Sequence, residues 1–172
     1  MILNQLTFVM KVLSVILCLL VFQTVLSQDR LVEEFPDVLV TAAEEQKSVI
    51  FIFDHPNCGW CRLFDNYHAL PEVKEILDPE YLIQKIDISE SESNRELFDH
   101  YNFMGVPAWM IFSSDKELLS DGRLENGELV GYPLEPANMD FYIEAIRRTS
   151  RHIKKRQLLV LREKLVYCDE HF

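Results

Sequence analysis

The feature that most constrains the fold of this chain is a pair of cysteines, Cys58 and Cys61, that comes directly after a short apolar run. The run covers residues 48–53 and is rich in β-branched and aromatic side chains, the pattern of a strand buried on both faces of a sheet. Residues 54–57 form a turn cluster, and apolar residues at helical spacing follow over residues 62–70. The cysteines are therefore expected where a central strand turns into a helix.

The rest of the chain alternates between predicted helices and predicted strands. Residues 81–88 and 108–112 have strand patterns, and Asn126-Gly127 is a strong hairpin signal. Helical patterns cover residues 30–47 with a break at Pro36, residues 72–77 after Pro71, residues 96–101, and a long region from Pro136 to about Val166 with a bend near Ser150. Strand–helix–strand units give right-handed parallel crossovers, and a later hairpin adds antiparallel edge strands. The sequence thus predicts an α/β fold with a central mixed sheet flanked by helices and an extended C-terminal helical region.

The position of the cysteine pair has a direct chemical meaning. Cys58 is expected at a helix N-terminus, where free backbone N–H groups and the helix dipole favour the thiolate form. Cys61 lies one turn further along and is expected to be more buried, close enough to resolve a mixed disulfide formed at Cys58. The pair can therefore exchange disulfides by attack, capture and release.

The stretch from about Ser48 to Arg147 resembles the thioredoxin fold, especially its exported branch with Cys-Gly-Trp-Cys centres. The resemblance implies that Cys58 is the nucleophile and Cys61 the resolving cysteine. It also implies a cis-proline facing the pair, and Val106-Pro107 before the third strand matches that site. In the family, the backbone before this proline pairs with an extended substrate chain.

Two positions next to the pair refine this resemblance. The dipeptide Gly59-Trp60 has no histidine beside the second cysteine, which favours a reductase over an oxidase; Trp60 itself is expected to contact apolar surface on a partner. Many thioredoxins keep a buried acid six residues before the nucleophile, and Ile52 occupies that position here. Asp54 and His55 lie nearby but are expected on an exposed turn, and neither is assigned a proton-transfer role.

The N-terminal residues have the pattern of a secretory signal. Lys11 precedes an apolar run over residues 12–22, and Val25 and Ser27 occupy the positions that a signal peptidase selects. We predict a signal peptide over residues 1–27 with cleavage before Gln28, which places the protein outside the cytoplasm, in a periplasm or secreted. The alternative is an uncleaved anchor, although about 15 apolar residues is short for a span that needs about 20. After the signal, we predict a thioredoxin-like domain over residues 28–150 and a basic helical extension over residues 151–172.

Charge is distributed unevenly along the chain. The net charge of −11 argues against a nucleic-acid binder, because contact with phosphates needs an excess of Lys and Arg. Residues 28–146 hold 25 acidic and 8 basic side chains, whereas residues 147–164 hold 8 basic side chains and one acid. This basic segment is expected to be a solvated helical face partly paired with the acidic body; the alternative is contact with an anionic membrane or an acidic partner.

The sequence leaves alternatives for the cysteines. A zinc site needs about four ligands, and neither the five histidines, expected on the surface or in turns, nor Cys168 supplies a second paired spacing. Cys168 is expected to be an exposed thiol near a fraying end. The aromatic residues Tyr101, Phe103, Trp109 and Phe112 are expected in the core.

Together these features predict an exported thiol–disulfide oxidoreductase, monomeric, without a metal or organic cofactor. Its expected partners are protein thiols and disulfides and a dithiol protein, possibly membrane-bound, that exchanges electrons with it. The alternative is a redox-inert thioredoxin-like binding module with a structural disulfide.

Overall fold

The computed structural model describes residues 29–171. They belong to two units, Met1–Glu34 and Phe35–Phe172. The described part of the first is the short helix α2 (Arg30–Glu34), where the Leu31 N–H donates a 3.0 Å hydrogen bond to the Asp29 carboxylate. The predicted signal peptide lies outside the described residues. Among residues 29–171, no helix has both the length and the apolar character needed to cross a membrane.

The second unit is built on a mixed four-stranded sheet. Its strands are β1 (Ser48–Asp54), β2 (Tyr81–Asp87), β3 (Ala108–Phe112) and β4 (Leu118–Ser120). The order is β2-β1-β3-β4, with β1 parallel to β2 and antiparallel to β3, and with β4 antiparallel to β3. This arrangement confirms the predicted thioredoxin-like fold class. Asn126-Gly127 closes only an isolated bridge between Arg123 and Leu129. The edge strand β4 instead follows β3 through a turn at residues 113–117.

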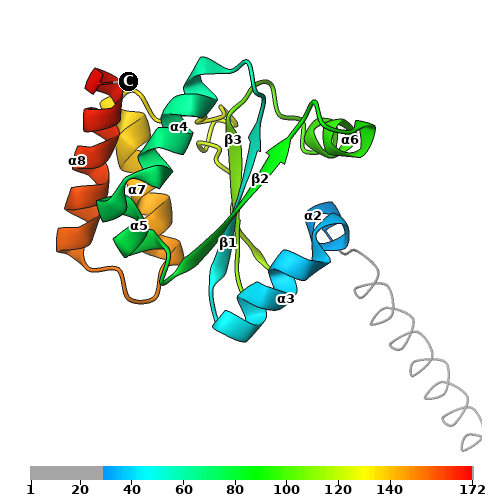
Figure 1. Cartoon of the computed structure of the whole chain (residues 1–172), viewed down its shortest axis with the longest axis horizontal. Helices are drawn as coiled ribbons and strands as arrows, with labels where there is room; N and C mark the ends of the chain where they lie inside the picture. Colours follow the sequence, from blue (N-terminus) through cyan, green and yellow to red (C-terminus); the bar gives the residue numbers. More distant parts are fainter. Residues whose placement is uncertain (1–28, 172) are drawn as a thin grey trace, which may run out of the picture. The chain divides into compact units, whose positions relative to one another are not determined.

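Helices cover both faces of this sheet (Figure 1). They are α3 (Pro36–Glu45), α4 (Gly59–Ala69), α5 (Pro71–Leu77), α6 (Glu92–His100), α7 (Pro136–Thr149) and α8 (Lys155–His171). Figure 1 shows α4, α5, α7 and α8 on one side of the sheet and α3 and α6 on the other. Ile50 and Ile52 of β1 belong to the core under the first group. Phe53 points the other way, with its ring 5.9 Å from that of Phe98 in α6. Helices on both faces explain why β1 is apolar at consecutive positions.

Helix α6 begins four residues earlier than the sequence predicts. Its N-cap is Ser91, whose hydroxyl oxygen accepts a 3.0 Å hydrogen bond from the Asn94 N–H. The first turn of α6 is polar and has no apolar periodicity, so the spacing of apolar residues does not predict that it is helical. The cap, not hydrophobic spacing, determines where this helix starts.

Helix α8 packs into the same core as the sheet and α4, so the C-terminal segment does not stand apart from the fold. Its buried residues are Leu158, Leu161, Leu165 and Cys168. The expectation that Cys168 is an exposed, fraying thiol is therefore wrong, because the side chain is fully buried. Burial raises the pKa of this thiol, and nearby Lys164 opposes the shift only in part.

The basic residues of α8 are partly paired, as the sequence predicts. Arg162 lies 2.6 Å from Asp140 of α7, and Lys164 lies 2.6 Å from Glu72 of α5. Such exposed ion pairs contribute little to stability. The docking of α8 therefore depends mainly on its apolar side chains.

His68 is also buried, which corrects the expectation that every histidine lies on the surface or in a turn. Its Nδ1–H donates to the Phe64 carbonyl oxygen at 2.8 Å, so Nε2, 3.0 Å from the Tyr142 hydroxyl, accepts from it. Burial lowers the pKa of His68 to about 4. The neutral ring thus satisfies both partners and ties α4 to α7.

Candidate active site

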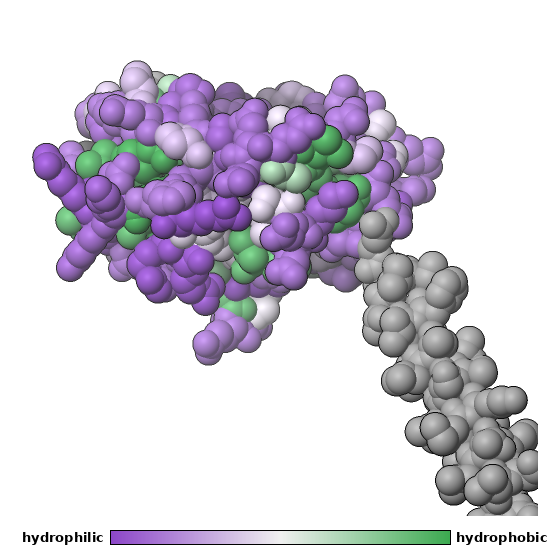
Figure 2. All heavy atoms as spheres, turned by 90° about the horizontal axis from the view of Figure 1, so that it is seen from below, coloured by the Kyte–Doolittle hydropathy of each residue, from purple (hydrophilic) through white to green (hydrophobic). Residues whose placement is uncertain are grey.

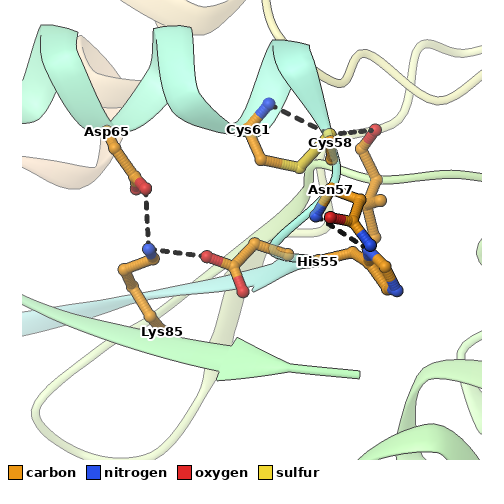
Figure 3. Close-up of a disulfide and its surroundings, with 8 residues drawn as sticks. His55, Asn57, Cys58, Cys61, Asp65 and Lys85 are labelled. Atoms are coloured by element: carbon orange, nitrogen blue, oxygen red, sulfur yellow. Dashed lines mark hydrogen bonds and ion pairs between the residues drawn. A yellow bond between two sulfur atoms is a disulfide. The ribbon is translucent and has the colours of Figure 1, made fainter. Parts of the chain in front are cut away.

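The two cysteines lie at the start of α4, where the chain leaves β1. Cys58 is the N-cap residue of α4, and its Sγ accepts a 3.0 Å hydrogen bond from the Cys61 N–H (Figure 3). The two residues form a disulfide, with their Cα atoms 5.2 Å apart. Cys58 is partly exposed, whereas Cys61 is only 3% exposed. The first sulfur is therefore the one that a partner protein can reach.

The loop before β3 lies against Cys58. The Val106–Pro107 peptide bond is cis, and Pro107 is buried while Val106 is partly exposed. The Cys58 Sγ lies 3.5 Å from the carbonyl oxygen of Val106, although 48 positions separate the two residues. Ala108 then pairs with Phe53 in the antiparallel β3–β1 ladder, which anchors the loop beside the end of β1.

Asp54 is placed differently from the prediction. It is the last residue of β1, only 8% exposed, and not part of an exposed turn. Because side chains alternate along a strand, Asp54 shares the face of Ile50 and Ile52 and points toward the α4 side. The structure thus supplies a buried acid two residues after the position where the resemblance places one. Strand alternation extended by one residue would have found it.

Lys85 of β2 connects this acid to the helix that carries Cys61. Its Nζ lies 2.6 Å from a carboxylate oxygen of Asp54 and 2.7 Å from one of Asp65 in α4 (Figure 3). Burial lowers the pKa of Lys85, but the hydrogen bonds to both carboxylates outweigh it and leave the pKa raised. The lysine therefore stays charged and holds the Asp54 side chain in place.

Asp54, Cys61 and Lys85 share one cleft. It has a volume of about 350 Å³ and is also lined by Asp65 and His55. Such a space is large enough for water molecules between the Asp54 carboxylate and the buried sulfur. His55 is engaged in the turn, where its Nδ1 accepts a hydrogen bond from the Asn57 N–H at 3.1 Å.

A second cleft is lined by all three predicted substrate-contact residues. Trp60, Val106 and Pro107 surround a groove of about 300 Å³ together with residues of the 129–138 segment. Trp60 is 49% exposed, and its ring stacks on Tyr132 with centroids 6.0 Å apart and planes 16° apart. No sequence motif marks Tyr132, so only the structure shows its place in the groove. The role of these residues in substrate binding stays a prediction.

No family model matches the chain, and no curated protein matches it. Among solved structures, it is similar to a disulphide isomerase from Xylella fastidiosa Temecula1, at 22% identity and a TM-score of 0.46, over 55% of this chain and 77% of that chain. It is also similar to DsbH oxidoreductase, at 17% identity and a TM-score of 0.47, over 66% of this chain and 81% of that chain. A thioredoxin from Thermus thermophilus is similar at 17% identity and a TM-score of 0.47, over 66% of this chain and 82% of that chain.

The site has no evident metal-binding set. Within residues 29–171, His, Cys, Asp and Glu side chains do not gather in groups of three or more that could hold a metal ion. What the arrangement offers is an accessible sulfur at a helix N-terminus, a buried partner sulfur one turn away, and a buried carboxylate that shares a cleft with the latter.

Proposed function

We propose that this protein is an exported thiol–disulfide oxidoreductase that reduces disulfides of protein substrates through Cys58 and Cys61. The observation that carries the proposal is the asymmetry of the pair. The Cys58 Sγ is accessible at the N-terminus of α4 and accepts a backbone N–H, while the Cys61 Sγ is buried one turn away. An N–H that points at sulfur stabilises a thiolate, because hydrogen bonds to a charged acceptor are stronger than those to a neutral one.

The proposed reaction has two steps. In the reduced protein, the Cys58 thiolate attacks one sulfur of a substrate disulfide, forms a mixed disulfide and releases the other substrate sulfur as a thiolate. Cys61 loses its proton and attacks the Cys58 Sγ, which forms the Cys58–Cys61 disulfide and releases the second substrate thiolate. The substrate gains two electrons, the protein loses two, and the released thiolates take up protons from water. A partner dithiol returns the protein to its reduced form.

Asp54 is proposed as the group that receives the proton of Cys61. Its carboxylate and Cys61 line the same cleft, and Lys85 fixes the carboxylate from the side of β2. A water molecule between the two groups would carry the proton, because the contact is through the cleft and not direct.

The substrate chain is proposed to pair with the Val106 backbone and to contact Trp60. The carbonyl oxygen of Val106 lies 3.5 Å from the Cys58 Sγ, so an extended chain bonded there would bring its disulfide to the sulfur. The reductive direction is supported by Gly59-Trp60, which places no histidine beside Cys61. Export is supported by the signal pattern over residues 11–27. On the face seen in Figure 2, hydrophobic side chains form separate patches among hydrophilic ones.

The direct test is capture of substrate on single-cysteine variants. Cys61→Ser should accumulate a mixed disulfide with oxidised insulin, seen by non-reducing electrophoresis and mass spectrometry, because the resolving sulfur is missing. Cys58→Ser should form no adduct and reduce no insulin. Cys168→Ser is the matched control and should react as the wild type does, because Cys168 is buried far along the chain in α8. An adduct-free Cys61→Ser variant would overturn the proposal.

The direction is tested by the reduction potential of the Cys58–Cys61 pair. Equilibration with glutathione buffers, followed by thiol trapping, gives this potential. A value below about −200 mV supports a reductase, and a value near −120 mV would instead indicate an oxidase.

A further inference from the structure

Tyr132 connects three parts of the molecule that meet at the candidate site. Its ring stacks on Trp60 between the two cysteines, with centroids 6.0 Å apart, and it contacts Phe64 of α4 edge-on at 6.1 Å. Its hydroxyl donates a 3.2 Å hydrogen bond to the carbonyl oxygen of Leu165 in α8. The residue is only 7% exposed, so these three contacts hold a side chain that lies almost wholly within the fold.

Its neighbour Gly131 brings the same segment against the cis-proline loop. A Cβ at this position would lie 2.7 Å from the carbonyl oxygen of Pro107, a distance that no side chain tolerates without a backbone shift. Glycine thus permits the close approach of residues 131–132 to Pro107. One short segment therefore touches the proline loop, the dipeptide of the redox pair and the C-terminal helix.

The groove formed by this segment has a defined chemical character. The groove is lined by Trp60 and Pro107 and by two residues of the 129–138 segment, Tyr132 and Leu134. Leu134 is 36% exposed, so the groove offers open apolar surface. Glu135 is the only acid among the lining residues. A volume of about 300 Å³ fits one large apolar side chain. The Glu135 carboxylate disfavours an acidic side chain in the groove, because the two negative charges would repel each other.

We propose that Tyr132 is a positioning residue, held by α8, that fixes the Trp60 ring and thereby forms a binding site for an apolar side chain next to the reacting cysteine of the substrate. The inference rests on the proposed disulfide exchange, because it names the substrate segment that this exchange selects. The groove lies next to the reacting sulfur, since Val106 lines the groove and its carbonyl oxygen lies 3.5 Å from the Cys58 Sγ. The bound segment would therefore lie within reach of the sulfur that attacks it.

The test compares disulfide substrates on the full-length protein. Cystine peptides that carry Leu or Glu beside the half-cystine are offered alongside hydroxyethyl disulfide, which is too small to fill the groove. The wild type should reduce the Leu peptide with a KM about tenfold lower than that for the Glu peptide, since burying a leucine is favourable. Tyr132→Leu should raise the KM for the Leu peptide about two- to tenfold, with a smaller effect on kcat, because the stacking contact is lost.

A spectroscopic measurement separates positioning from general damage to the core. Acrylamide quenching reports mainly on Trp60, because Trp109 is fully buried. Quenching should increase most in Tyr132→Leu, which loses the stacked ring, and to a smaller extent in Tyr132→Phe, which keeps the ring and loses the bond to Leu165 of α8. Tyr142→Phe is the matched control: it removes another buried hydroxyl of the same core and should change neither quenching nor KM.

A second pair of variants covers the case in which Tyr132→Leu does not fold. Leu134→Gln alters an exposed wall of the groove, and Leu159→Gln alters an exposed apolar residue of α8 outside it. The first should weaken the preference for the Leu peptide, and the second should leave it intact. Equal use of the Leu and Glu peptides by the wild type would overturn the inference, whereas failure to exchange even with hydroxyethyl disulfide would overturn the proposed function.

Discussion

At the scale of single residues, the proposed resolving step depends on where the proton of Cys61 can go. Two carboxylates contact the same Lys85 ammonium, but they differ in their surroundings. The Asp54 side chain is 11% exposed, whereas the Asp65 side chain is 39% exposed. A carboxylate held away from solvent beside the buried sulfur is the better placed acceptor, because its position is fixed by packing.

Asp54→Asn should therefore slow the resolving step. The substitution keeps the shape of the side chain and removes the proton acceptor, so release of the second substrate thiol at neutral pH should slow by about tenfold or more. Stopped-flow measurement of that release is the readout. Asp65→Asn is the control, because it loses a contact with the same ammonium from a more exposed position; equal slowing in both variants would mean that only the ion pair matters.

His68 predicts how stability depends on pH. Its folded pKa of about 4 lies below the ordinary value of 6.5, so the unfolded chain binds a proton at this residue between these values and the folded chain does not. The contribution of His68 to the free energy of unfolding should therefore be constant above pH 6.5 and fall by about 1.4 kcal/mol for each pH unit below it, until pH 4.

Urea denaturation of the wild type and of His68→Gln at several pH values measures this effect. Carboxylates titrate in the same range in both proteins, so the difference between the two curves isolates the histidine. A difference that stays constant from pH 7 to pH 4 would show that His68 is not the group responsible.

At the scale of helices and strands, the sequence predicts the elements around the redox pair well. The apolar run gives β1, proline marks the start of α5 at Pro71, and Val106-Pro107 leads into β3. These succeed because each depends on a local signal, either a run of buried side chains or a residue with a fixed backbone preference. The prediction fails for the start of α6 at Glu92, because a single polar N-cap residue determines where this helix begins.

The contacts of α8 are a different case, because they depend on tertiary structure. Its many charges favour a solvated helix, and only the folded molecule shows that Leu161 and Cys168 face the core. The same holds for Tyr132, whose importance comes from its neighbours and not from its place in a motif. Asp54 lies between these cases, since the alternation of β1 predicts its face once the strand is extended to include it.

Leu161 tests whether α8 is an integral part of the fold. Leu161→Ala removes a fully buried side chain and should lower the free energy of unfolding by about 2–5 kcal/mol. Leu159→Ala, in which the lost side chain is 60% exposed, should change it by less than about 0.5 kcal/mol. Urea denaturation followed by circular dichroism gives both values, and a small effect of Leu161→Ala would show that α8 is only loosely attached.

At the scale of the whole molecule, the three cysteines of the described chain differ in access. Cys58 is partly exposed, and Cys61 and Cys168 are buried, the latter with a pKa raised by burial. A thiol that is both shielded and protonated reacts slowly, because the thiolate is the reactive form. In the folded protein, Cys58 of the redox pair is therefore accessible to reagents, whereas the Cys168 sulfur is not.

Alkylation of the reduced protein tests this difference. Brief treatment with iodoacetamide should modify Cys58 in the folded protein and modify Cys168 only after urea is added. Peptide mass spectrometry assigns each adduct to its cysteine. Rapid labelling of Cys168 without denaturant would mean that α8 opens readily.

If the protein is exported as we propose, the burial of Cys168 has a consequence for its biosynthesis in an oxidising compartment. While the chain is still unfolded, this sulfur competes with Cys58 and Cys61 for partners, and a wrong pair would leave the redox site without one of its members. Once α8 packs against the core, Cys168 is buried and can no longer pair with the other cysteines. Substitutions that delay this docking should therefore yield cross-linked, misassembled chains rather than merely less stable monomers, so the C-terminal helix protects the correct pairing of two cysteines from which it is distant in sequence.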